Sequence, residues 1–273
     1  MIDLHLHSLA SDGELSPSEL VLQAKQENIT VISLTDHDSI SGLCEAKRQC
    51  EKLGITFIPG VELEASTEIS RSRYIHILAY NFKDYTLLGN YLNNLKVERQ
   101  QLIRDYVILL NSLGYTTSFE EISSLTPGTH LAVYHVVMFL CRKGYFNDFS
   151  TAKKIFINPD AKYYIRRNFY DVEFIIQLIL KAGGIPVLAH PCRLPQKGEE
   201  LDSYLAFLTQ KGLKGIESYY SQHSKNEIVF YEYLSRKYNL IQTAGSDWHS
   251  PNESIKMGMH LPNEDQIVSC ILK

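Results

Sequence analysis

Short apolar segments of strand length recur along the chain and alternate with segments of helical periodicity. Seven such candidate strands cover residues 2–7, 31–35, 55–61, 73–80, 185–189, 215–219 and 240–244. Strands that alternate with helices in this way are typical of parallel β/α architectures, in which each helix covers the sheet formed by its neighbouring strands. The sequence therefore predicts an α/β fold. This alternation restricts the possible arrangements of strands and helices more strongly than the amino-acid composition does.

The alternation stops between residues 85 and 170, where the pattern is almost wholly helical. A long amphipathic segment covers residues 87–113, and shorter helical segments follow it. We expect residues 85–170 to be a helical insertion between the fourth and fifth strands, and residues 1–84 and 171–273 to form the main domain. The insertion holds ten Lys/Arg against six Asp/Glu, a net of +4, and the remainder holds 17 against 25, a net of −8. A basic insertion next to an acidic main domain would suit an anionic substrate. The same charge distribution is equally compatible with a solvated helical face that binds no substrate.

Composition narrows the class of protein. The five cysteines are scattered without a C-x-x-C pair, which favours reduced thiols in a cytoplasmic protein over a disulfide framework or a thiolate zinc site. No apolar run reaches membrane-spanning length, and the N-terminal residues form no signal peptide. The chain is not strongly basic and its tyrosines are dispersed, so we expect neither a membrane nor duplex nucleic acid as a partner.

Histidine and carboxylate side chains gather where the predicted strands end. Strand ends on the C-terminal side are where β/α barrels place their chemistry. Each such residue alone is more often structural; a lone His-x-His, for example, commonly lies on a surface strand. Nine of them on one rim predict metal binding instead, since imidazole and carboxylate groups are common metal ligands. The nine candidates are His5, His7, Asp12, His37, Glu62, His76, His190, Asp247 and His249.

These segments resemble the PHP family (polymerase and histidinol phosphatase). The resemblance covers roughly residues 1–80 and 171–260, and it implies a distorted (β/α)7 barrel that binds three divalent metal ions and hydrolyses phosphoesters. The matching motifs are Asp3-x-His5-x-His7, Ser11-Asp12-Gly13, Thr35-Asp36-His37-Asp38, Gly60-Val61-Glu62, His76, Ala189-His190-Pro191 and Gly245-Ser246-Asp247-x-His249.

The resemblance also implies a ligand set for each metal. The sets are His5, His7, Glu62 and Asp247 for the first, Glu62, His76 and His190 for the second, and Asp12, His37 and His249 for the third. Such ligands suit Mn²⁺, Zn²⁺ or Fe²⁺ and do not choose among them. The metals would activate a hydroxide for attack on phosphorus, which makes Glu62 and Asp247 catalytic residues. Asp3, Asp36 and Asp38 could orient the histidines or equally cap loops.

The insertion and later segments resemble one PHP branch, which includes nucleoside 3′,5′-bisphosphate phosphatases and a 5′-to-3′ exoribonuclease. Those segments are Gly215-Ile216-Glu217-x-Tyr219 and Ser221-x-His223. In that branch the insertion shapes a pocket beside the metals. Arg193 resembles its phosphate-contacting arginine, a role that suits a guanidinium. His223 either contacts the phosphate or leaving group or is a surface residue at a helix start. The expected substrate is a small nucleotide or a short 5′-phosphorylated oligonucleotide.

One departure from the branch concerns the substrate. Gly128 stands where the branch usually has an arginine, although His130 is retained. Arg166 or Arg167 could compensate, or either could be a plain surface residue. Two other functions stay open: a phosphatase for a non-nucleotide metabolite such as histidinol phosphate, and a metal-binding regulatory module without chemistry. The complete ligand set argues against the second.

Overall fold

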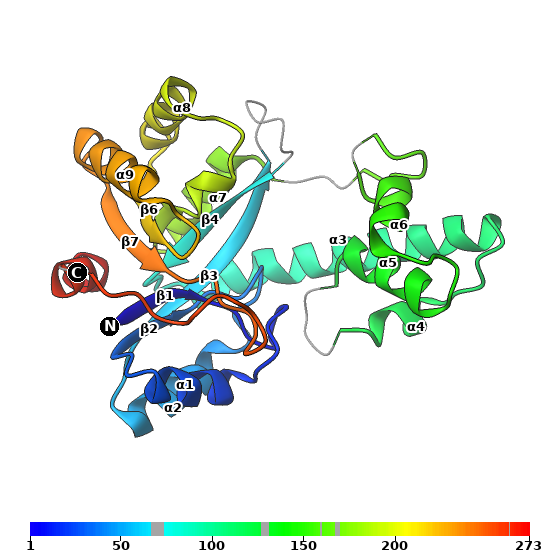
Figure 1. Ribbon diagram of the computed structural model, residues 1–273, viewed down its shortest axis with the longest axis horizontal. Coiled ribbons are helices and arrows are strands. Elements are labelled where there is room, and N and C mark those ends of the chain that lie inside the picture. The colour runs from blue at the N-terminus through cyan, green and yellow to red at the C-terminus, as the bar shows by residue number, and fades with distance from the viewer. Residues whose placement is uncertain (67–73, 127–130, 159, 167–169, 262) are drawn as a thin grey trace. The chain divides into compact units, whose positions relative to one another are not determined.

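The computed structural model describes residues 1–66, 74–126, 131–158, 160–166, 170–261 and 263–273. The chain divides into two compact units, residues 1–89 with 169–273 and residues 90–168 (Figure 1). Among the described residues, none of the helices combines the length and the apolar character that a membrane span requires.

The first unit is built on seven strands whose spatial order follows their order in the sequence. They are β1 (Ile2–Leu6), β2 (Val31–Leu34), β3 (Thr56–Ser66), β4 (Tyr74–Tyr80), β5 (Ile185–Leu188), β6 (Gly215–Tyr220) and β7 (Ile241–Gly245). The chain just after β7 returns to β1, because the backbone N–H of His7 donates to the carbonyl of Trp248 at 3.0 Å. This arrangement is a nearly closed α/β barrel, as predicted.

The expectation of a wholly parallel set of strands is wrong for β4. This strand pairs antiparallel with both β3 and β5, whereas the other neighbouring pairs are parallel. The physical reason is the length of the connection. A parallel neighbour needs a crossover of about a dozen residues or more, and only residues 67–73 separate β3 from β4. The fourth strand must therefore run back beside the third.

Helices cover the outside of the barrel (Figure 1). They are α1 (Pro17–Gln26), α2 (Leu43–Leu53), α7 (Val172–Lys181), α8 (Glu199–Gln210), α9 (Lys225–Lys237) and α10 (Glu264–Leu272). Two of them begin at capping boxes. Ser16 accepts from the backbone N–H of Glu19 before α1, and Ser224 accepts from that of Glu227 before α9. Such caps satisfy backbone N–H groups that the first helical turn leaves without partners.

The second unit is helical and has a hydrophobic core of its own. Its helices are α3 (Tyr85–Ser112), which begins in the first unit, α4 (Phe119–Ser123), α5 (Val133–Arg142) and α6 (Phe149–Phe156). Tyr106 is fully buried in this core, and its hydroxyl donates to the carbonyl of Phe156 at 2.8 Å. A side chain of this size can be buried because its single polar group has a partner.

Candidate metal centre

Three strands bring the first group of predicted ligands together at the centre of the barrel. His5 lies on β1 and His7 directly follows that strand, Glu62 lies on β3, and Asp247 lies in the turn after β7. Nε2 of His5 lies 3.2 Å from Oε2 of Glu62 and 3.3 Å from Oδ1 of Asp247. Nε2 of His7 lies 3.3 Å and 3.1 Å from the same two oxygens. Two imidazole nitrogens and two carboxylate oxygens therefore point at one common position.

This first group fits a divalent metal ion. Ligand atoms about 2.0–2.1 Å from a tetrahedral zinc ion lie about 3.3 Å from one another, close to the separations found here. Nε2 of His5, Nε2 of His7 and Oε2 of Glu62 are buried and make no hydrogen bond within the described residues. Buried polar atoms without partners are costly, and a cation between them would remove that cost.

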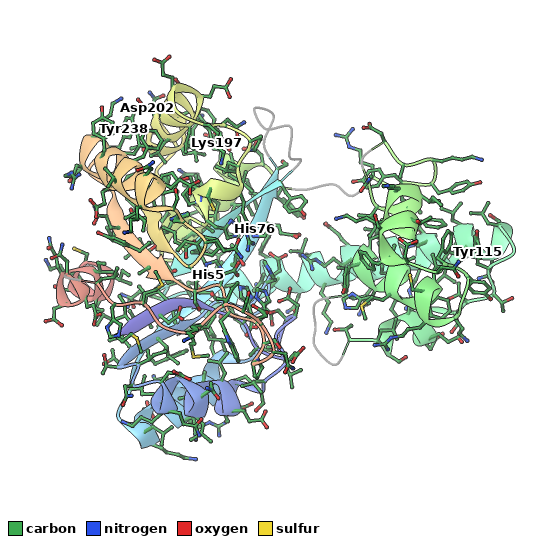
Figure 2. All side chains as sticks on the ribbon, viewed as in Figure 1. His5, His76, Tyr115, Lys197, Asp202 and Tyr238 are labelled. Atoms are coloured by element: carbon green, nitrogen blue, oxygen red, sulfur yellow. The ribbon has the colours of Figure 1, made fainter. Side chains whose placement is uncertain are left out.

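Glu62 also belongs to a second group, through its other oxygen. Oε1 of Glu62 lies 2.8 Å from Nδ1 of His76 and 2.9 Å from Nε2 of His190, and these two nitrogens are 3.2 Å apart. Figure 2 shows His5 and His76 within the barrel unit. His5 contacts Oε2 of Glu62, whereas His76 contacts Oε1. His76 comes from the antiparallel strand β4. One fully buried carboxylate thus faces two candidate metal positions.

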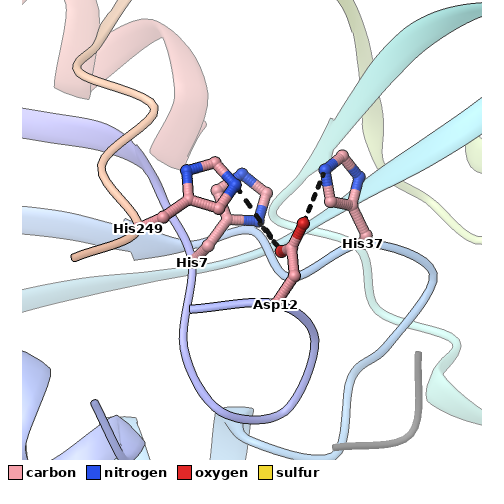
Figure 3. Close-up of side chains that lie close together, drawn as sticks. All are labelled: His7, Asp12, His37 and His249. Carbon is pink, nitrogen blue, oxygen red and sulfur yellow. Dashed lines mark ion pairs between the residues drawn. The ribbon is translucent and has the colours of Figure 1, made fainter. Parts of the chain in front are cut away.

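The third group surrounds Asp12, which follows β1 (Figure 3). Its Oδ1 lies 3.5 Å from Nε2 of His249 and 3.6 Å from Nδ1 of His7, and its Oδ2 lies 3.8 Å from Nε2 of His37. The sequence assigned Asp12, His37 and His249 to this position, and the structure adds His7 beside them. Because Nε2 of His7 faces the first group, this imidazole lies between two groups.

Burial and charge act in opposite directions on these imidazoles. Burial lowers the pKa of His7, but the neighbouring carboxylates of Asp247 and Glu62 outweigh this effect and raise the pKa to about 10. For His37, burial dominates over the nearby carboxylates and lowers the pKa to about 4. A metal ligand must be a neutral imidazole, so metal binding would displace the proton of His7. Metal affinity at the first group is therefore expected to fall as the pH is lowered.

Glu217 contacts two candidate metal ligands, His5 and His190, and the sequence did not predict these contacts. It is fully buried on β6, and its Oε1 accepts from Nδ1 of His5 at 2.9 Å. Its other oxygen accepts from the backbone N–H of His190 at 2.6 Å. A carboxylate that accepts from Nδ1 leaves Nε2 of His5 available as a ligand. The sequence feature that could have predicted this contact is a carboxylate in the middle of an apolar strand. A buried carboxylate requires a hydrogen-bond partner.

For Asp3 and Asp36 the contacts favour the second of the two roles considered, that of holding loops. Asp3 accepts from the backbone N–H and the hydroxyl of Ser246 at 2.9 and 2.6 Å. Asp36 accepts from the same two groups of Ser8 at 2.7 and 2.8 Å, and Asp38 accepts from a backbone N–H of β3 at 3.4 Å. These carboxylates hold the loops that carry the ligands and, in these bonds, do not contact the imidazole rings.

Two predicted ligands occupy a backbone conformation that is rare for them. His190 has φ 25° and Asp247 has φ 57°, both in the left-handed region. A residue other than glycine costs on the order of 1–3 kcal/mol there, and such strain persists where the surroundings fix it. It concentrates at functional sites, which agrees with the position of both residues beside Glu62 and His5.

The two predicted substrate contacts lie on the β5–β6 side of the barrel. Arg193 ends a short 3-10 turn after β5, and its Nη2 lies 2.8 Å from Oδ2 of Asp247. His223 is half-buried rather than on the open surface, and its Nδ1–H donates to the carbonyl of Ser218 at 3.1 Å. Burial lowers the pKa of His223, so its neutral form is favoured.

The remaining predicted positions lie in the second unit or outside the described residues. Arg166 is exposed. Gly128, His130 and Arg167 lie outside the residues that the structure describes.

Replacing Glu217 by Gln is expected to weaken metal binding about 10- to 100-fold, the effect typical of losing a partner of a ligand. The amide would place an NH₂ group against either Nδ1–H of His5 or the N–H of His190, where only acceptors fit. Metal titration followed by calorimetry measures the effect. Glu173→Gln on α7, whose carboxylate pairs with Lys211 at 2.6 Å, is the control. Equal affinities in the two variants would refute this role.

Comparison with known proteins assigns the family. The PHP domain model matches residues 3–181. The 5'-3' exoribonuclease of Haemophilus influenzae is 29% identical over 97% of this chain and 96% of its own length. The 3',5'-nucleoside bisphosphate phosphatase of Chromobacterium violaceum is 27% identical over 92% of this chain and 88% of its own. A Bifidobacterium adolescentis protein, predicted to be a metal-dependent phosphoesterase, has a solved structure with TM-score 0.80 at 25% identity, covering 99% of this chain and 95% of that one. The chain belongs to the PHP domain family, and it is a metal-dependent phosphoesterase.

Proposed function

We propose that this phosphoesterase acts on small nucleotides, either nucleoside 3′,5′-bisphosphates or the terminal phosphodiester of short 5′-phosphorylated RNA. The observation that carries the proposal is Glu62, whose two oxygens face two groups of histidines, with Arg193 beside the first group. The names of the Haemophilus influenzae and Chromobacterium violaceum relatives support nucleotide substrates.

We infer three metal positions from the three groups, with Mn²⁺, Zn²⁺ or Fe²⁺ as the candidate ions. The ligand sets are His5, His7, Glu62 and Asp247; Glu62, His76 and His190; and Asp12, His37 and His249. Divalent ions held there would supply Lewis acidity to a phosphoryl oxygen and lower the pKa of a water molecule. The protein fixes the ligands through Glu217 and through the loops that Asp3 and Asp36 hold.

Arg193 and His223 are the candidates for substrate contacts. One Nη of Arg193 is engaged by Asp247, and the side chain is 45% exposed, so its other N–H groups remain available for a phosphate oxygen. His223 donates through Nδ1, and its Nε2 makes no hydrogen bond within the described residues. A neutral Nε2 accepts a hydrogen bond, which favours a hydroxyl of the leaving group over a phosphate oxygen.

Residues 1–84 and 171–273 form the proposed catalytic barrel domain, and residues 85–170 form the proposed insertion subdomain. The insertion carries an excess of basic residues, ten Lys/Arg against six Asp/Glu. It is therefore the candidate for selecting among phosphorylated substrates.

Assays with added Mn²⁺ that detect both released inorganic phosphate and released mononucleotide test the function. We expect hydrolysis of a nucleoside 3′,5′-bisphosphate or of a 5′-phosphorylated oligoribonucleotide, complete loss of activity after chelation, and recovery when Mn²⁺ is restored. The same oligoribonucleotide with a 5′-hydroxyl is the matched control. Hydrolysis of histidinol phosphate alone would contradict the nucleotide assignment and support a metabolite phosphatase. A protein that binds metal but hydrolyses none of these substrates would support the regulatory module.

A further inference from the structure

Tyr220, the last residue of β6, has no role in the function proposed so far. Its side chain is 1% exposed, and its hydroxyl lies 3.1 Å from Oδ2 of Asp247. Nη2 of Arg193 donates to the same hydroxyl. The hydroxyl of Tyr220 therefore lies between the candidate phosphate-binding arginine and a candidate metal ligand.

The direction of these hydrogen bonds follows from chemistry. A guanidinium has donors but no acceptor, so the oxygen of Tyr220 must accept from Arg193. An ionised carboxylate has acceptors but no donor, so the O–H of Tyr220 must donate to Asp247. The tyrosine hydroxyl satisfies both requirements at once, which neither a phenylalanine nor a second carboxylate could do.

The two oxygens of Asp247 divide their contacts between the two sides of the site. Oδ1 lies 3.3 Å from Nε2 of His5 and 3.1 Å from Nε2 of His7. Oδ2 contacts Tyr220 and lies 2.8 Å from Nη2 of Arg193. The bond from Tyr220 therefore involves the oxygen of Asp247 that does not face the histidines.

The Arg193 side chain needs contacts that hold it in one conformation. It is 45% exposed, and a long exposed side chain loses considerable rotamer entropy when it binds in one conformation. The ring of Tyr220 adds a second contact, since the guanidinium carbon lies 5.3 Å from the ring centroid. A guanidinium that is already held in place binds phosphate without this entropy loss.

We propose that Tyr220 is a positioning residue that holds Arg193 over the first metal group for binding of the substrate phosphate. The inference rests on the proposed function, because it assumes that Arg193 contacts phosphate. It assigns to Tyr220 a part in substrate affinity and leaves the metal ligands unchanged.

Tyr220→Phe tests the inference, because it keeps the ring contacts and removes only the hydroxyl. In the Mn²⁺-loaded protein we expect the affinity for inorganic phosphate, measured by calorimetry, to fall about tenfold, as for one lost hydrogen bond to a charged group. KM should rise by a similar factor, with kcat and bound metal nearly unchanged. Tyr219→Phe is the matched control, since that hydroxyl contacts Glu232 on α9 at 2.6 Å.

A double-mutant cycle separates the positioning role from a general structural one. Arg193→Ala should weaken phosphate binding, and adding Tyr220→Phe should then cause no further loss. Additive losses, or phosphate affinity unchanged in Tyr220→Phe while Arg193→Ala weakens it, would overturn the positioning role alone. Phosphate affinity unchanged in Arg193→Ala would instead refute the phosphate contact of the proposed function, and the inference with it.

Discussion

Replacing Glu62 by Gln is expected to lower kcat/KM by more than about 10³-fold, because two candidate metal positions lose the same ligand. Oε2 of Glu62 lies within 3.3 Å of His5 and His7, and Oε1 lies within 2.9 Å of His76 and His190. An amide removes the negative charge and directs an NH₂ group at imidazole nitrogens on one side. Both effects oppose a cation at this position.

Steady-state kinetics and metal analysis of the purified Glu62→Gln variant measure the effect. At most about one equivalent of Mn²⁺ should remain tightly bound, at the third group, since the first two groups share this carboxylate. Glu173→Gln, a surface carboxylate on α7, controls for the loss of one charge and should retain wild-type activity. Substantial activity in Glu62→Gln would show that this carboxylate is not part of the catalytic centre.

Gly245→Ala is expected to destabilise the barrel by more than about 3 kcal/mol, beyond the usual range of about 1–3 kcal/mol for overpacking. A Cβ at position 245 would lie 2.2 Å from Cβ and 2.9 Å from the backbone N of His5, and 2.8 Å from Oε1 of Glu217. The backbone of β1 cannot move away without disrupting its pairing with β2. Relief of the clash would therefore displace His5 from the first group.

Urea unfolding of the chelator-treated protein measures this loss, and metal titration should show weaker binding at the first group. Gly89→Ala in α3 is the matched control, because the nearest atom to its new Cβ would be Cδ1 of Ile40 at 4.0 Å. That substitution should stabilise the helix by about 0.5–1 kcal/mol, the usual difference between glycine and alanine. Equal stabilities of the two variants would contradict the close approach of β7 to β1.

The barrel and its candidate metal ligands could be predicted from the sequence, because both depend on short local patterns of residues. Strands of five or so residues end in histidine or carboxylate, and a barrel brings such ends to one rim whatever the details of packing. His5, Glu62 and Asp247 could thus be chosen without knowing their distances. The direction of β4 was less accessible, because the predicted third strand ends at residue 61 and leaves residues 62–72 as the connection, whereas β3 extends to Ser66.

Other contacts depend on packing between distant segments and could not be found in this way. Glu217 and His5 are 212 residues apart, and only the closure of the barrel makes them partners. The same holds for Tyr220 with Asp247, where a tyrosine in an apolar strand is normally a core residue. The loop contacts of Asp3 and Asp36 are of this kind too, because their partners are serines, which are common in loops everywhere.

The pairing of β4 with β5 has a consequence for how such enzymes diversify. Tyr80 lies directly opposite Ile185, so the chain leaves the barrel and rejoins it at adjacent positions. Antiparallel neighbours can be joined by a two-residue turn, and residues 81–184 far exceed that need. The entropy cost of closing a loop grows only slowly with its length. Sequence can therefore be gained, lost or exchanged at this point during evolution with little effect on the strands beneath, and an ancestral metal-binding barrel could acquire new substrates by replacing this one connection.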